Sequence, residues 1–298
     1  MNKTLIVTGA SGFVGQNLYA YLNENFIFQP LSIRYTPKQH LILNSNFVIH
    51  LAGKAHDLKS VSQPKDYYEA NFKLTKQLYA AFLKSNAQKF IYISSVKAAA
   101  DHINEPLTEM HPPSPLTHYG KSKLLAEEYI SSQPLPQGKS FYILRPCMIH
   151  GPGNKGNLNL LHKFASRGIP YPLAAFDNKR SFLSVENLCF VIKELLDSDN
   201  IPSGLYNVAD DEPLSTTQLY SLISASIDKI PSLLNITPSI IFCIAKIGDK
   251  LGLPLNSERL GKLTENYVVS NTKIKHAIKK ELPLGAQQGI ILTAQSFK

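Results

Sequence analysis

A glycine-rich turn near the start of the chain most constrains its fold. Residues 5–8 form an apolar run that predicts a strand, and the apolar spacing of residues 13–22 predicts a helix. The intervening TGASGFVG places Gly9, Gly12 and Gly15 at three-residue intervals. Such a turn leaves backbone N–H groups and a helix dipole open to a pyrophosphate. The sequence therefore predicts a dinucleotide site here, with a plain packing turn as the alternative.

Strand and helix patterns continue to alternate through the first half of the chain. The other predicted strands are 27–33, 41–43, 47–51, 90–94 and 141–144, and the predicted helices are 66–83 and 119–131. Apolar strands that alternate with helices are typical of a parallel sheet covered on both faces. Residues 27–51 leave almost no room for a helix between their last two strands, so we expect a departure there from a full doubly wound pattern.

The second half of the chain is more mixed and shows no linker. Its predicted helices are 157–167, 186–197, 215–227, 238–251 and 272–280, and its predicted strands are 181–185 and 205–209. The predicted fold is α/β, a Rossmann-type doubly wound parallel sheet with a smaller interwoven α/β substrate lobe. We expect residues 1–150 plus about 186–212 to form the NAD(P)-binding domain. Residues of about 151–185 and 213–298 would then form the substrate lobe.

Charge and cysteine content narrow the function classes. The formal charge is +9, from 31 Lys and Arg against 22 Asp and Glu, but no dense basic run occurs. The simplest interpretation is a solvated basic surface, and the alternatives are an anionic small ligand, a membrane surface or, least favoured, nucleic acid. Cys147, Cys189 and Cys243 have no metal-ligand spacing, so we expect no metal and three buried, reduced thiols.

The sequence favours a cytoplasmic protein without stable membrane insertion. Its N-terminus runs directly into a predicted strand, which leaves no room for a signal peptide. The apolar residues 240–247 are far too few to span a bilayer. We expect residues 238–251 to form an amphipathic helix that packs in the core, with docking onto a membrane or partner as the alternative. A homodimer is left open.

A Tyr-x-x-x-Lys pair supplies candidate proton-transfer chemistry. Tyr119 and Lys123 share a helix face, and the ammonium is expected to lower the pKa of the phenol. The preceding strand ends in Ser94 and Ser95, at the sheet edge where ligands bind in parallel sheets. The tyrosine can then exchange a proton with a sugar hydroxyl while a nicotinamide exchanges hydride.

The cofactor is predicted to be NADP or NAD, with NADP slightly preferred. No Asp or Glu occurs between Asn25 and His56, where an NAD site usually places an acid on the ribose. Arg34 ends the second predicted strand instead, and a guanidinium suits a 2′-phosphate. The alternative is a surface arginine beside a site that accepts both cofactors.

Several motifs now stand together in a recognisable order. They are TGASGFVG, HLAG at 50–53, EANFKLT with Asn71, ISSVK, YGKSK and LRPCMIHGPG. Along nearly its whole length the chain resembles extended short-chain dehydrogenases, the NAD-dependent epimerase/dehydratase family. It looks closest to bacterial relatives of UDP-galactose 4-epimerase that act on UDP-N-acetylhexosamines or their 4-keto derivatives. The stretches KGNLNLLHKFASRGIPYPL and DNKRSFLSVENLC carry this closer likeness.

The resemblance implies roles for individual residues. Ser95, Tyr119 and Lys123 would be catalytic: a hydrogen-bonding serine, a proton-transferring tyrosine, and a lysine that binds the nicotinamide ribose. With the glycine turn, it predicts cofactor contacts from Gly9, Ser11, Gly12, Phe13, Val14, Gly15, Arg34, Leu51, Ala52, Gly53, Asn71, Ser94, Tyr119, Lys123 and Pro146.

The resemblance also implies a UDP-sugar as substrate, bound partly by Ser95. Arg180 would grip the diphosphate, Asn157 and Leu158 would lie nearest the uridine, and Arg259 is a weaker candidate for a second phosphate contact. The alternatives are a surface ion pair for Arg180 and a helix cap for Asn157.

Departures from the family pattern limit the reaction. Val96 and Lys97 stand where dehydratases carry Asp-Glu, so a 4,6-dehydratase is disfavoured. Met148 replaces an asparagine of the galactose epimerases, which argues against simple UDP-galactose/UDP-glucose interconversion. His150 replaces a tyrosine, and a lone histidine there is more often structural.

The leading hypothesis is therefore redox chemistry at C4 of a UDP-linked amino sugar, in bacterial surface polysaccharide synthesis. It takes the form of a 4-epimerase or of a 4-reductase for a 4-keto-6-deoxy sugar. The alternative class is a non-catalytic NAD(P)-binding regulator on the same fold. Because the chain keeps Tyr-x-x-x-Lys, which such a regulator can lack, the enzyme is preferred.

Overall fold

One parallel sheet organises the first part of the molecule. The computed structural model describes residues 3–55, 63–154, 156–251 and 256–297, except the side chains of Asn157, Glu258, Arg259 and Lys262. The sheet has the strand order β2-β1-β3-β4-β5-β8, and every neighbouring pair is parallel. Its strands are β1 (Lys3–Thr8), β2 (Phe26–Leu31), β3 (Phe47–His50), β4 (Lys89–Ile93), β5 (Ser140–Pro146) and β8 (Gly204–Val208). Because β2 and β3 flank β1, a ligand crevice is expected at the carboxyl ends of β1 and β3.

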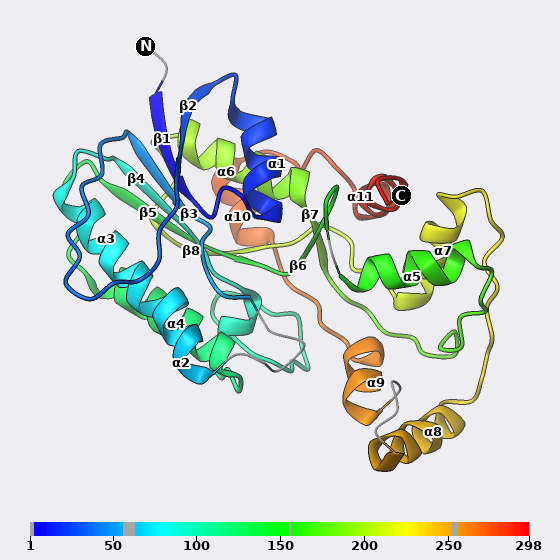
Figure 1. Cartoon of the computed structure of the whole chain (residues 1–298). Helices are drawn as coiled ribbons and strands as arrows, with labels where there is room; N and C mark the ends of the chain where they lie inside the picture. The colour runs from blue at the N-terminus through cyan, green and yellow to red at the C-terminus, as the bar shows by residue number, and fades with distance from the viewer. Residues whose placement is uncertain (1–2, 56–62, 155, 252–255, 298) are drawn as a thin grey trace.

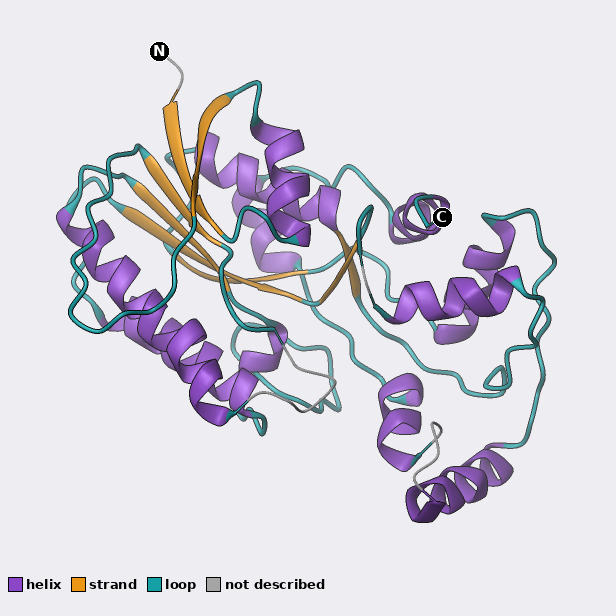
Figure 2. Cartoon of the chain, viewed as in Figure 1, coloured by secondary structure: helices purple, strands orange, loops and turns teal. Residues whose placement is uncertain are grey.

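Helices cover both faces of this sheet (Figure 1; Figure 2). One face carries α1 (Phe13–Leu22), α6 (Val185–Asp197) and α10 (Thr272–Ile278), and the other carries α3 (Leu74–Lys84) and α4 (His118–Ser132). All five residues of β4 are buried, as expected for a strand packed on both sides. The predicted α/β Rossmann-type class is confirmed.

The prediction of a strand at 41–43 is wrong. The chain between β2 and β3 is an irregular loop in which Lys38 has a φ of 60°. Leu43 is nevertheless buried, and it packs with Leu78 and Phe82 of α3. The alternating apolar residues therefore serve packing against a helix and make no sheet hydrogen bonds.

The helix predicted at 66–83 is interrupted by a wider turn. It runs as α2 (Pro64–Tyr67), then η1 (Tyr68–Lys73), then α3, and η1 is a π-helix. Such segments frequently occur at functional sites, because they turn one side chain out of the regular helical phase. Here η1 carries the buried Asn71.

A second group of helices packs around its own apolar core. It contains α5 (Asn157–Ser166), α7 (Thr216–Ala225), α8 (Pro238–Leu251), α9 (Ser257–Thr264) and α11 (Ala286–Gln295). A small parallel pair, β6 (Met148–His150) and β7 (Phe182–Ser184), leads into it. Neither β6, α9 nor α11 was predicted. The later segment with Tyr267, Val269 and Ile274 returns to the core of the main sheet, so the two parts are interwoven.

Two expectations about apolar residues need correction. Cys147 and Cys189 are buried as expected, but Cys243 is exposed on α8. The helix predicted at 238–251 is present, yet only Ile241, Ala245 and Gly248 are buried on it. Among the described residues, no helix is both long and apolar enough to cross a membrane.

A buried ion pair fastens α4 to β5. Arg145 Nε lies 3.0 Å and 3.1 Å from the two carboxylate oxygens of Glu127, and its Nη2 lies 2.5 Å from Oε2. Both side chains are only 3 % exposed. The Ser94 hydroxyl also donates to Glu127, so the pair reaches the end of β4. Removing one partner of such a pair leaves an uncompensated buried charge.

We predict that Arg145→Met lowers the free energy of unfolding by about 3–5 kcal/mol. The double variant Glu127→Leu/Arg145→Met should lose less than this single variant, because no charge is then left buried. Urea denaturation of the three proteins measures both effects. A single variant as stable as the unmodified protein would contradict the prediction.

Candidate active site

The glycine turn brings β1, α1 and the end of β3 into close contact. Gly9 has a φ of +70°, and a Cβ there would lie 2.7 Å from the backbone nitrogen of Ala52. A Cβ on Gly15 would lie 2.5 Å from the Gly9 carbonyl oxygen. Gly12 is the N-cap of α1 and supplies no side-chain cap. The N–H groups of the first turn of α1 therefore have no side-chain cap.

The residues present fit a dinucleotide. A helix N-terminus without a side-chain cap presents N–H groups to a phosphate, and the glycines allow close approach. Ser11 and Gly12 are exposed, whereas Phe13 and Val14 are half-buried against the core. Backbone groups of this turn would hold the pyrophosphate of the cofactor.

Asn71 ties the end of β3 to α4. Its Oδ1 accepts from the Lys54 backbone nitrogen at 2.7 Å, and its Nδ2 donates to Ser122 Oγ at 3.0 Å. A Cβ on Gly53 would lie 2.7 Å from Asn71 Oδ1 and 3.2 Å from Lys123 Nζ. Leu51 and Ala52 come just before this contact and are half-buried. The predicted cofactor residues Ala52, Gly53, Asn71 and Lys123 therefore converge in space.

Ser95 and Tyr119 face each other across the end of the sheet. Ser95 follows β4 and caps η2 (Val96–Ala98), accepting from the Lys97 backbone nitrogen at 3.2 Å. Tyr119 lies in the first turn of α4, whose N-cap Thr117 accepts from the Gly120 nitrogen at 3.1 Å. The Ser95 hydroxyl lies near enough to the Tyr119 phenol to lower its pKa. The predicted serine–tyrosine pair is thus assembled.

Lys123 lies one helical turn beyond Tyr119 and is buried. Its Nζ donates to the Ile93 carbonyl oxygen at 2.8 Å and lies 4.8 Å from the centre of the Tyr92 ring. Burial lowers the pKa of Lys123 to about 8, against an opposing attraction from Glu127. The protonated and neutral forms of Lys123 therefore both occur at pH values near 8.

The expectation that Lys123 lowers the pKa of Tyr119 is contradicted. Burial raises the pKa of Tyr119, and the nearby Ser95 hydroxyl opposes that rise. Removal of the phenol from water outweighs any charge effect, and the Lys123 ammonium is directed at Ile93. In this state Ser95 is the group that favours ionisation of the tyrosine.

Several other predicted residues lie at the edges of this site. Ser94 directs its hydroxyl to Glu127, so the strand-end serine that reaches Tyr119 is Ser95. Pro146 is the last residue of β5. Arg34 is exposed and lies three residues beyond the end of β2. A role for Arg34 in cofactor choice stays a prediction.

The predicted substrate residues are placed unequally. Arg180 is half-buried, and its Nη1 donates to the Glu265 carbonyl oxygen at 3.3 Å. Burial lowers the pKa of Arg180, while Glu265, Tyr267 and Cys147 oppose that shift. Leu158 is 2 % exposed and packs in the second core, so only its main chain is available to a ligand. The side chains of Asn157 and Arg259 lie outside the described residues.

Sequence reasoning missed a contact between Lys97 and Tyr267. The ammonium of Lys97 lies 4.4 Å from the centre of the Tyr267 ring, and the Tyr267 hydroxyl donates to the Ala100 carbonyl oxygen at 2.7 Å. Tyr267 is also bridged to Arg180 through the backbone. These residues join the Ser95 loop to the second part of the molecule. No motif contains Tyr267, and so no sequence signal could have paired it with Lys97.

His150 is structural, as expected. It is fully buried, its Nδ1 lies 2.8 Å from Thr293 Oγ1, and its Nε2 lies 3.5 Å from Asp210 Oδ2. Asp210 also accepts from the Ser184 nitrogen and from Asn187 Nδ2. The histidine thus links β6 to α11.

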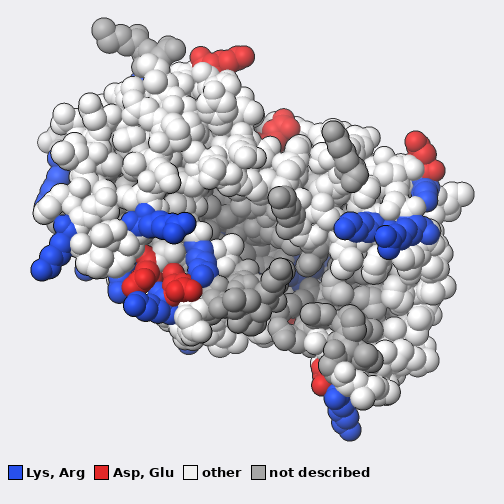
Figure 3. All heavy atoms as spheres, in the orientation of Figure 1, with Lys and Arg blue, Asp and Glu red and all other residues white. Residues whose placement is uncertain are grey.

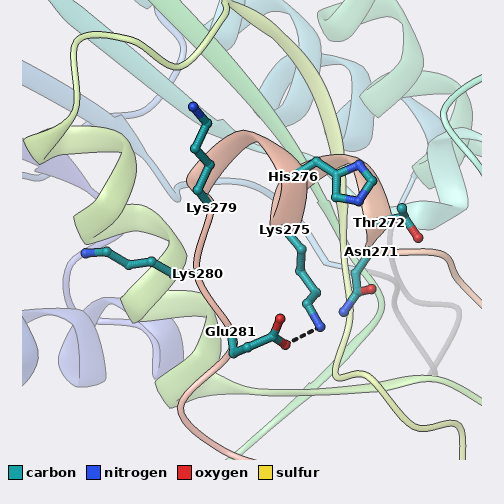
Figure 4. Close-up of a pocket in the computed structure, with 7 residues that line it drawn as sticks. All are labelled: Asn271, Thr272, Lys275, His276, Lys279, Lys280 and Glu281. Carbon is teal, nitrogen blue, oxygen red and sulfur yellow. Dashed lines mark ion pairs between the residues drawn. The ribbon is translucent and has the colours of Figure 1, made fainter.

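The surface of the described residues is hollowed in several places. Figure 3 shows the molecular face hollowed between the sheet and the second group of helices. Another hollow, of about 520 Å³, is lined by residues of α10 and of the segments next to it (Figure 4). Its Lys275 pairs with Glu281 and Asp211, and its Lys280 pairs with Glu194. Because these lysines already have carboxylate partners, we assign no ligand to it.

Comparison with known proteins agrees with this geometry. The model of the NAD dependent epimerase/dehydratase family matches residues 38–209. The chain belongs to this family. The family is enzymatic and uses nicotinamide cofactors, and solved structures of the same fold hold NADPH or NAD.

Individual relatives span most of the chain. A UDP-glucose 4-epimerase of Vibrio cholerae is 28% identical, covering 100% of this chain and 96% of its own length. An N-acetyl-alpha-D-glucosaminyl-diphospho-ditrans,octacis-undecaprenol 4-epimerase of Escherichia coli O157:H7 is 31% identical, covering 78% of this chain and 75% of its own length. MoeE5, solved in complex with UDP-glucuronic acid and NAD, superposes with a TM-score of 0.75 at 17% identity, covering 98% of each chain.

We predict that Gly15→Ala weakens cofactor binding. The added Cβ would overlap backbone atoms of Gly9 and Ala10, and overpacking of this kind costs about 1–3 kcal/mol. The dissociation constant for NADPH or NADH should rise about tenfold or more. Gly285→Ala is the matched control, because nothing lies within 4 Å of its Cβ position. A titration followed by nicotinamide fluorescence measures the cofactor affinity of both variants. Equal affinities would contradict a role of the glycine turn in cofactor binding.

The buried Lys123 predicts a pH-dependent stability. Its pKa is about 8 in the folded chain and 10.5 for the ordinary side chain, so the unfolded chain binds more protons between these values. The quantity to measure is the free energy of unfolding of the unmodified protein minus that of the Lys123→Met variant. This difference should rise between about pH 8 and about pH 10.5, by up to ~3 kcal/mol. Lys121→Met, which removes an exposed lysine of α4, should show no such rise. If the difference for Lys123→Met stayed constant or fell over this pH range, the lowered pKa of Lys123 would be refuted.

Proposed function

We propose that the chain is a nicotinamide-dependent oxidoreductase acting at C4 of a diphosphate-linked sugar. It would be a UDP-N-acetylhexosamine 4-epimerase or a 4-reductase for a UDP-4-keto-6-deoxy-hexosamine, in bacterial surface polysaccharide synthesis. The observation that carries the proposal is that Ser95 and Tyr119 lie close together beside the buried Lys123, next to the glycine turn.

The residues divide the chemistry among themselves. A bound nicotinamide supplies or accepts the hydride at C4. The Tyr119 oxygen takes the proton of the C4 hydroxyl during oxidation and returns a proton during reduction. The Ser95 hydroxyl holds the C4 oxygen beside that phenol. Lys123 lies between the tyrosine and the cofactor cradle, where it would bind the nicotinamide ribose and add positive charge beside the site.

The cofactor is proposed to be NADP or NAD, with NADP slightly preferred. Arg34 lies just beyond the end of β2, exposed to solvent, where it can meet a 2′-phosphate. No carboxylate occurs between Asn25 and His56 to bind the 2′-hydroxyl of NAD.

A UDP-sugar is the proposed substrate. The Vibrio cholerae relative is named for UDP-glucose, and MoeE5 holds UDP-glucuronic acid. Arg180, placed where the Ser95 loop meets the second group of helices, would contact the diphosphate. That second group would form the substrate lobe, with the domain division predicted from the sequence. A homodimer remains a prediction.

The structure around Ser95 gives no support to a dehydratase. Val96 is 4 % exposed, and Lys97 is engaged with Tyr267 and with the Asp101 carbonyl oxygen. Neither residue offers the acid needed to remove water. A non-catalytic NAD(P)-binding regulator is disfavoured, since Ser95 and Tyr119 lie close together beside Lys123, as proton transfer would require.

A second substrate class has one specific observation in its favour. The Escherichia coli relative is named for a sugar carried on a lipid diphosphate, and helix α8 of this chain exposes an apolar stripe. The same C4 chemistry on a polyprenyl diphosphate sugar is therefore the runner-up.

Incubation with a panel of UDP-sugars, 4-keto UDP-sugars and polyprenyl diphosphate sugars tests the function. Product stereochemistry identifies epimerisation, and net NAD(P)H consumption identifies reduction. We predict that Tyr119→Phe lowers kcat by roughly a hundredfold to ten-thousandfold and leaves cofactor affinity unchanged. Undiminished turnover by this variant would exclude the proposed mechanism.

A further inference from the structure

Helix α8 presents two different apolar faces. Ile241, Ala245 and Gly248 point into the second core. A separate stripe consists of Ile240, Ile244, Ile247 and Leu251, which are 54%, 43%, 55% and 68% exposed. The spacing i, i+4, i+7, i+11 places these four side chains on one line along the helix, about a quarter turn from the buried face.

A continuous exposed stripe of this kind calls for a partner. Single exposed aliphatic residues are ordinary on protein surfaces, whereas aligned ones mark an interaction site. Helix α8 lies at the far end of the second group of helices, away from the sheet (Figure 1). It packs mainly against α9, so its outer side is presented to the surroundings.

Charge around the stripe selects the partner. Lys250 is exposed and borders the stripe on the side away from the buried face, and the exposed Lys246 lies farther round the helix on that same side. The one acidic residue of α8, Asp249, lies nearly opposite the stripe and accepts from the Ser257 nitrogen and hydroxyl at 2.9 Å and 2.6 Å. An apolar line edged by lysines matches lipid tails below anionic headgroups.

A second copy of the chain fits this surface less well. In a symmetric dimer with antiparallel α8 helices, the lysine edge of one copy would lie beside the lysine edge of the other. A 14-residue helix is only about 21 Å long, and one stripe of it buries far less than the roughly 1,000 Å² expected of a stable interface.

We propose that α8 docks in the plane of an anionic lipid bilayer, with Ile240, Ile244, Ile247 and Leu251 inserted and Lys246 and Lys250 at the headgroups. This is attachment to one leaflet. It rests on the helix alone and does not require the proposed function.

Flotation with lipid vesicles tests the proposal on the full chain. The protein should bind vesicles of phosphatidylcholine mixed with phosphatidylglycerol, more weakly at high salt and more weakly on phosphatidylcholine alone. Ile247→Glu should reduce the partition coefficient about tenfold or more. Leu292→Glu, on the exposed side of α11, adds the same charge to another helix and should bind as the unmodified protein does.

Cys243 allows an independent measurement of insertion. It is exposed on α8 beside the stripe, whereas Cys147 and Cys189 are buried, so a polarity-sensitive maleimide should label it selectively. Its emission should shift to the blue on anionic vesicles and stay unchanged for the Ile247→Glu variant. Circular dichroism checks that each variant is folded.

Either of two outcomes would overturn the proposal: no vesicle binding by the folded protein, or equal binding by the Ile247→Glu and Leu292→Glu variants. A dimer that dissociates on Ile247→Glu, without vesicle binding, would assign the stripe to a second copy instead. Because none of these measurements uses turnover, failure here would leave the proposed C4 chemistry intact.

Discussion

The arrangement of the site depends on how one face of α4 is held against the sheet. Tyr119, Lys123 and Glu127 recur every four residues and so share that face. Glu127 is held by Arg145 of β5 and by Ser94, the residue that follows β4. This buried ionic contact sets the rotation of the helix, and that rotation carries the lysine to the Ile93 carbonyl and the tyrosine to Ser95. An electrostatic contact outside the reacting centre therefore determines its geometry.

Burial gives the site its electrostatic character. Burial raises the pKa of Tyr119 and lowers the pKa of Lys123, because each side chain is withdrawn from water. The neutral form of each side chain is therefore favoured. A neutral phenol is a ready proton donor, which suits reduction of a ketone, and oxidation requires that it first lose its proton. The positive charge of an oxidised nicotinamide would favour that loss. With a cofactor bound, the position of the Tyr119 proton would thereby be coupled to the redox state of the nicotinamide.

Sequence patterns predicted the parts of the fold that depend on local periodicity. The glycine turn, the sheet strands and the face shared by Tyr119 and Lys123 all follow from residues close in sequence. The strand expected at 41–43 failed because alternating leucines can pack on a helix as readily as on a sheet. The predicted direction of the Tyr119 pKa shift was wrong, because residue spacing determines which helix face a side chain lies on but not how far that side chain is removed from water. The contact of Lys97 with Tyr267 joins residues 170 positions apart, which no local pattern encodes.

Helix α8 gives a second example of what a local sequence pattern cannot predict. Periodicity correctly predicted the helix and an apolar face, but the sequence holds more apolar residues than one face needs. Burying all of them would require cover on two sides, and the second group of helices supplies it on one. The surplus stripe adds nothing to the folded core, and an exposed aliphatic line carries a cost in solubility and aggregation. A surface that is costly in water and flanked by cations is best explained by an environment outside water, and that environment would place the crevice beside substrates carried at a membrane.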